Sequence, residues 1–363
     1  MTVIFASALF LLLTCPVRAA NAEIYDETGA ADNFDLLDEE TKRILSAVGA
    51  DLSDPSSVTE ISPSRVLHTA LTLFIDGFGN AGAQLSLLIG MILLFAVVSQ
   101  FLPQHETGGA ITVLTMFGFA AVELPVVTDL VRSVLSAVET VSVFVKTMIP
   151  WMGVIVASAG APASSAALTG AAVGCAQVVT AAVDYLFVPL TGSYGAIVLS
   201  GAADEMFSLD RCARLLKKVF VICLGGAALI FVGVLSLRGV AARAADSLAF
   251  KGAKFLIGGL VPVVGGAMSD GLSTMTASLN AVNDAVGALG IAAIGILILP
   301  PLLKVLTHRA VLWCASLAGE LAGLERGQSF LSGISELLSM LNILLLFDGF
   351  VFICALGLLI GAS

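Results

Sequence analysis

Four ionisable residues lie inside long apolar stretches of this sequence. Asp348 is the clearest, and Glu123, Asp184 and Lys146 are further candidates. A charge at the centre of a bilayer costs about 2.5 kcal/mol or more, so such residues line a polar pathway or pair with one another inside a helix bundle. The sequence leaves both possibilities open, because it does not show which residues pair.

A proline between two glycine pairs marks a second unusual stretch. Pro262 removes a backbone donor and the glycines loosen both sides, which predicts a broken or re-entrant helix near residues 255–269. Irregular backbone survives at membrane depth only when it is buried in protein or lines a wet cavity. Pro262, Gly265 and Gly266 are therefore candidate conduit positions, with Asp270 at the mouth.

The motifs of common enzymes are missing. The sequence contains no Walker A, G-x-S-x-G or H-E-x-x-H pattern, its six cysteines are scattered, and its three histidines are isolated, so we expect those histidines to be structural or interfacial. The Gly77–Gly82 segment matches G-x-G-x-x-G without a preceding strand, and we expect a flexible break there. The sequence predicts no catalytic, cofactor or metal site. An intramembrane protease is disfavoured, although the scattered aspartates keep it open.

The amino-acid composition indicates whether the chain folds in water or in a lipid bilayer. Hydrophobic residues make up 58% of the 363 residues and charged residues only 12%, about half of the roughly 25% found in soluble domains. Folding in water would expose too much apolar surface, so a bilayer is the expected environment. Eleven acidic residues between 21 and 65 account for most of the net charge of −10. Such a segment would be repelled by a phosphate backbone, which excludes nucleic acid as a partner.

The chain divides into four expected regions. Residues 1–22 are typical of a signal peptide, 23–65 form an acidic exported region with a helix near Leu36–Val48, 66–83 an amphipathic or interfacial helix, and 84–363 a multi-pass transmembrane domain. The signal segment would place the acidic region outside the cytoplasm.

The predicted fold is an all-α polytopic membrane bundle with six to eight spans, because a spanning helix needs about 20 apolar residues. The G-x-x-x-G pairs that begin at Gly170, Gly319 and Gly357 favour close helix packing. The apolar segments are Gln84–Leu102, Ala110–Thr128, Val134–Ala159, Ala166–Val183, Leu186–Ser200, Val219–Leu237, Phe255–Met268, Ala285–Leu303 and Leu338–Gly361.

Blocks between Met148–Pro150 and Asn283–Gly287, among them Pro262–Gly266, resemble the stage III sporulation protein AE family of endospore-forming bacteria. The most specific is the Pro-Val-Val-Gly-Gly block in its context. The resemblance is carried by Met148–Pro150, Ala157–Ala167, Leu215–Lys217, Gly233–Ser236, Ala241–Asp246, Lys254–Phe255, Pro262–Gly266, Ser269–Asp270 and Asn283–Gly287.

The resemblance implies a non-enzymatic multi-pass subunit in the mother-cell membrane around the forespore. It would belong to the transenvelope channel complex that links the two cells, acting with an ATPase, ring-forming subunits and other stage III sporulation proteins of the same operon. Late forespore gene expression and spore formation would depend on it. The alternative, taken from the residues, is a self-contained secondary transporter or permease that uses Asp348, Asp184 and Glu123 as coupling sites.

Overall fold

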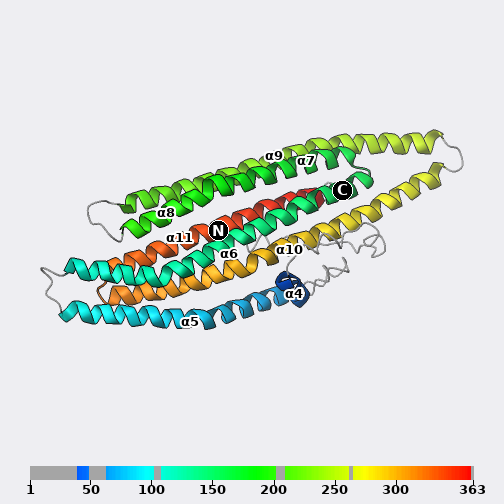
Figure 1. Cartoon of the computed structure of the whole chain (residues 1–363). Coiled ribbons are helices and arrows are strands. Elements are labelled where there is room, and N and C mark those ends of the chain that lie inside the picture. The colour runs from blue at the N-terminus through cyan, green and yellow to red at the C-terminus, as the bar shows by residue number, and fades with distance from the viewer. Residues whose placement is uncertain (1–38, 49–62, 102–107, 202–208, 261–264, 361–363) are drawn as a thin grey trace.

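The computed structural model describes residues 39–48, 63–101, 108–201, 209–260 and 265–360 (Figure 1). Short turns apart, these residues are all helical, and no strand occurs among them, which confirms the all-α prediction. The signal segment 1–22 and most of the acidic region lie outside the described residues. The helices are α4 (Glu39–Val48), α5 (Pro63–Phe101), α6 (Gly108–Ser158), α7 (Pro162–Ala182), the π-helix η2 (Val183–Phe187), α8 (Val188–Gly201), α9 (Leu209–Leu260), α10 (Gly265–Leu321) and α11 (Glu325–Ile360).

The long helices run roughly side by side along one axis (Figure 1). α11 packs against α6, α9 and α10, and α10 also packs against α5 and α6. α7 and α8 pack against α9, and the short α4 lies on α5 and α10. The core is therefore built mainly between α6, α10 and α11, with α5 on one side and the α7–α9 group on the other.

Among the described residues, six stretches are long and apolar enough to cross a membrane, at the lower end of the predicted six to eight. The expected segments 110–128 and 134–159 are both part of α6, whose interior tolerates Pro125 and Pro150. Those at 166–183 and 186–200 are joined without a turn through η2. The six stretches are Ala81–Ser99, Val113–Ser158, Pro162–Ser200, Arg211–Leu248, Leu279–Leu321 and Glu325–Ile360.

The π-helix has a local cause in Pro189. A proline cannot donate the backbone hydrogen bond that the carbonyl four residues earlier expects. Here the backbone N–H of Val188 bonds the carbonyl of Val183, five residues back, so the hydrogen-bond ladder is already shifted when it reaches Pro189. The extra residue in this turn carries the helix past the proline.

Glycines in the left-handed region close the α6–α7 and α10–α11 hairpins. Gly160 (φ 94°) ends α6 and Gly323 (φ 74°) ends α10. The N–H of Ala161 bonds the carbonyl of Val156 at 3.2 Å, and the equivalent bond follows Gly323. This glycine-capped helix end makes α6 antiparallel to α7 and α10 antiparallel to α11.

The break predicted near residues 255–269 falls partly outside the described residues: α9 is described as far as Leu260 and α10 from Gly265, and Pro262 lies in the undescribed interval between them. α9 and α10 have 52 and 57 residues, or about 78 and 86 Å at 1.5 Å per residue. Their facing ends extend past the other helices (Figure 1). A bilayer core is only about 30 Å thick, so both helices must continue well beyond it.

One expected irregularity is wrong. The break predicted at Gly77–Gly82 does not occur, because α5 is one helix from Pro63 to Phe101. A single exposed glycine lowers helix propensity by only about 1 kcal/mol relative to alanine, and the apolar residues that follow hold α5 against the bundle.

Candidate functional site

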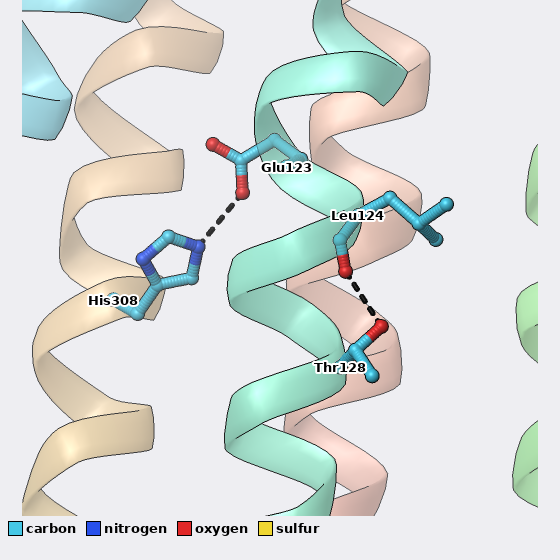
Figure 2. A network of polar contacts seen from close by, with 4 residues as sticks. All are labelled: Glu123, Leu124, Thr128 and His308. Atoms are coloured by element: carbon cyan, nitrogen blue, oxygen red, sulfur yellow. Dashed lines mark hydrogen bonds and ion pairs between the residues drawn. The ribbon is translucent and has the colours of Figure 1, made fainter.

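The first polar cluster joins α6 to α10 inside the bundle. His308 Nε2 lies 2.8 Å from Glu123 Oε2, and their side chains are 5% and 0% exposed. Figure 2 shows the ring and the carboxylate pointing at each other across the space between the two helices. The second carboxylate oxygen, Oε1, is buried and has no hydrogen-bond partner among the described residues.

This arrangement places Glu123 in a polar pair within the bundle. A buried carboxylate beside an imidazole can exist as an ion pair or, after proton transfer, as a neutral pair, so the site can hold one proton in either of two places. Nearby, the hydroxyl of Thr128 donates to the carbonyl of Leu124 within α6 and does not join the pair (Figure 2).

The second polar cluster lies between α6 and α7, near α11. Lys146 Nζ donates to Thr180 Oγ1 at 3.1 Å, and that hydroxyl also lies 2.8 Å from Ser142 Oγ. Lys146 is close enough to Asp348 of α11 to act on it electrostatically. Asp348 is 1% exposed, and its Oδ2 has no hydrogen-bond partner in the described part of the chain. The Asp348 carboxylate is thus incompletely satisfied inside the bundle.

Three aromatic rings pack in a row that begins at the residue before Asp348 in α11. The ring of its neighbour Phe347 lies 6.1 Å from that of Phe187 in η2, and Phe187 is 5.3 Å from Phe220 of α9 in an edge-on arrangement. These rings fix the level at which η2, α9 and α11 meet.

The other predicted positions are not gathered with these two clusters. Asp184 is exposed on the outer side of η2. Gly265, Gly266 and Asp270 occupy the first turns of α10, beside the break and at one end of the bundle. The structure therefore separates the conduit candidates from the buried carboxylates Glu123 and Asp348.

Sequence reasoning missed three polar contacts between distant helices. Asp246 of α9 accepts the backbone N–H of Ala163 at 2.9 Å and that of Ser164 at 2.6 Å, so it caps the start of α7 from another helix. Lys217 of α9 forms an ion pair with Glu336 of α11. His308 was expected to be structural or interfacial, but its partner was unknown. No spacing in the sequence identifies these pairs, because their members are 82 to 185 residues apart.

Cavities and metal ligands add little chemistry. A wholly apolar groove of about 270 Å³ lies between α6, α8 and α11, with Leu124, Gly195 and Leu337 in its wall. No group of three or more His, Cys, Asp or Glu side chains suited to a metal ion occurs within the described ranges. The polar pairs within the bundle are therefore the main candidates for function among the described residues.

Comparison with known proteins identifies the family. A family model described as stage III sporulation protein AE matches residues 56–363, which is most of the chain. The chain belongs to the stage III sporulation protein AE family. Both clusters and the break around 255–269 lie within the family match, whereas residues 1–55 lie outside it.

A curated family member, stage III sporulation protein AE of Bacillus subtilis (strain 168), is 25% identical over 171 residues. The aligned region covers 47% of this chain and 43% of the relative, so the chain matches less than half of that protein's length. No solved structure matches. Family membership indicates a role in sporulation, and the helices indicate a multi-pass membrane protein.

Proposed function

We propose that this protein is a non-enzymatic membrane subunit of the sporulation channel complex that links mother cell and forespore across their envelopes. The observation that carries the proposal is the family match over residues 56–363. Six long apolar helices in the described part of the chain support a membrane component, and polar pairs between helices suit a rigid subunit.

Partners supply what this sequence lacks. It contains no P-loop, so P-loop ATP hydrolysis would come from a separate ATPase of the same operon, with ring-forming subunits completing the channel. We place the chain in the mother-cell membrane around the forespore, with the acidic segment 23–65 exported behind the signal segment 1–22. Late forespore gene expression and spore formation would depend on this assembly.

In this proposal the break around residues 255–269 contributes to the conduit at one end of the bundle. α9 and α10 project there past the other helices, which suits an element that meets another subunit or forms the mouth of a path (Figure 1). Pro262, Gly265, Gly266 and Asp270 are the positions to vary first.

A self-contained secondary transporter is the second candidate, and one observation favours it. Asp348 is buried with an unpartnered oxygen, an arrangement typical of carboxylates that bind and release protons in transporters. Reconstitution separates the candidates. A transporter moves a solute when it is alone in vesicles, whereas a channel subunit is inert without its partners.

The decisive experiment is deletion of the gene in its native host, followed by counts of heat-resistant spores and measurement of a late forespore-specific reporter after engulfment. We expect engulfment to finish, the reporter to stay dark and spores to fail. Normal spores would contradict the proposal and leave the transporter as the function to test.

A further inference from the structure

One carboxylate of the span Pro162–Ser200 faces away from the bundle. Asp184 is exposed, and within the described part of the chain no hydrogen bond or ion pair reaches it. Between Ala163 and Ser200 the sequence contains no other Asp, Glu, Lys, Arg or His. The helix therefore presents a single charge on an otherwise uncharged outer surface, where contact with lipid alone is costly.

Small and polar residues continue from Asp184 along the same side of α7. They recur at alternating spacings of four and three residues, which places them on one face of a helix. All are exposed. We call the following set the α7 outer face: Gly170, Gly174, Gln177, Ala181 and Asp184.

The two glycines of the α7 outer face are not required by packing within the chain. A Cβ added at Gly170 or Gly174 would meet nothing within 4 Å. By contrast, a Cβ at Gly290 in the core would lie 2.8 Å from Met148 Cε. Glycines four residues apart on a membrane helix let the backbone of another helix approach closely. Here the approaching helix would come from outside the described chain.

Two of the other ionisable groups in the apolar stretches have a side-chain partner inside the bundle. Glu123 pairs with His308, and Lys146 donates to Thr180. Asp184 instead faces outward beside the exposed amide of Gln177. A carboxylate in a low-dielectric environment is best satisfied by a cationic donor.

We propose that the α7 outer face docks a transmembrane helix of another membrane protein that carries a Lys or Arg side chain level with Asp184. A second copy bound through the same face would bring two Asp184 carboxylates together, and like charges disfavour that pairing. The inference goes beyond the proposed function and does not depend on it, because a transporter could also bind a partner helix here.

The test uses the full-length protein in lipid vesicles and two synthetic transmembrane peptides. Both peptides carry Gly-x-x-x-Gly. In the Lys peptide a lysine follows a glycine of this motif at the same sequence separation as that between Gly174 and Asp184. The Leu peptide has leucine at that position. Energy transfer between labelled protein and peptide reports binding. We expect the Lys peptide to bind about tenfold more tightly than the Leu peptide, and Asp184→Asn to remove that preference.

Two glycine variants complete the experiment. Gly174→Ile should weaken binding of both peptides, because the added side chain keeps the helices apart. Gly90→Ile is the control, since Gly90 is an exposed glycine of α5 with nothing within 4 Å of an added Cβ, and it should change neither affinity. Equal binding of the two peptides would overturn the proposal and place Asp184 in water at the membrane boundary. Self-association that Gly174→Ile abolishes would overturn it in favour of a second copy.

Discussion

Glu123 and His308 lie 2.8 Å apart in the interior of the bundle and tie α6 to α10. A buried pair of this kind stabilises a protein little compared with well-packed apolar residues, because both groups lose their hydration. Removal of one partner is far more costly than removal of both, since it leaves the other group buried alone.

Glu123→Leu or His308→Leu alone should lower the free energy of unfolding by about 3–5 kcal/mol. The double variant should recover most of that loss, because neither polar group then remains buried without its partner. Circular dichroism, which follows helix content during detergent-induced unfolding, measures the free energy of unfolding of the single and the double variants. A double variant as unstable as the two single losses combined would show that the pair is not coupled.

The same double variant also separates a structural role from a proton-handling role. If the pair only joins helices, a stable Glu123→Leu/His308→Leu protein should support spore formation in the native host, and this is the result we expect. A protein that is stable and present at normal levels but yields no spores would show that the polar groups themselves are needed.

Asp246 fixes the start of α7 through two backbone amides, which predicts a local effect of its removal. Asp246→Ala should lower the free energy of unfolding by about 1–2 kcal/mol, the usual effect of losing a helix cap. Asp246→Asn should cost less, because an amide oxygen still accepts a bond although the favourable charge at the helix N-terminus is lost.

Hydrogen exchange at the amides of Ala163 and Ser164 checks this prediction. Exchange there should quicken in Asp246→Ala more than elsewhere in α7. Asp129→Ala is the matched control, since Asp129 is an exposed aspartate of α6, and it should leave these amides unchanged. Unaltered exchange in Asp246→Ala would mean that the carboxylate does not hold the helix end.

Hydropathy predicted the helical class and the approximate number of spans, because in lipid a helix satisfies its own backbone. Helix continuity was harder to predict. α6 carries Asp129 and Arg132 between the apolar stretches 110–128 and 134–159, which divides it into two segments by composition, yet both side chains are exposed and the helix continues. In the same way, 166–183 and 186–200 were predicted as separate segments, and the π-helix η2 joins them ahead of Pro189.

The apolar stretches around the ionisable residues identify those residues in the sequence. Their partners could not be identified in this way. The cost of an intramembrane charge singles out Glu123 and Asp348 from sequence alone. The partner of Glu123 is 185 residues away, and only the packing of α6 against α10 brings it near. The same limit applies to Asp184, because sequence gives its position along the helix and the structure gives its outward direction.

Gly333 permits close contact between α11 and α8. A Cβ there would lie 2.8 Å and 3.1 Å from the two methyl carbons of Val198, and a branched residue can yield little. Gly333→Leu should therefore destabilise the protein by about 1–3 kcal/mol through overpacking. Gly357→Leu, in the same helix but with nothing within 4 Å of an added Cβ, should change stability much less. Equal effects in the same unfolding assay would contradict this contact.

Asp348 has a setting that folding does not explain. It is 1% exposed and its Oδ2 is unpartnered among the described residues, so the carboxylate gains little in return for its lost hydration. Asp348→Leu should be as stable as the wild type within about 1 kcal/mol, or more stable, because an apolar side chain carries no such cost. We nevertheless expect spore counts to fall, because a residue that does not serve folding is retained for its chemistry.

Asn342→Leu is the matched control for Asp348→Leu. Asn342 lies in the same helix at 3% exposure, and both amide atoms of its side chain lack partners in the described chain. Its replacement should be equally well tolerated by the fold, yet it removes no ionisable group, so spore counts should stay normal. Normal counts in both variants would show that the Asp348 carboxylate has no role in sporulation. A fall in both would trace the defect to packing of α11, because the two changes share only the replacement of a buried polar side chain by leucine.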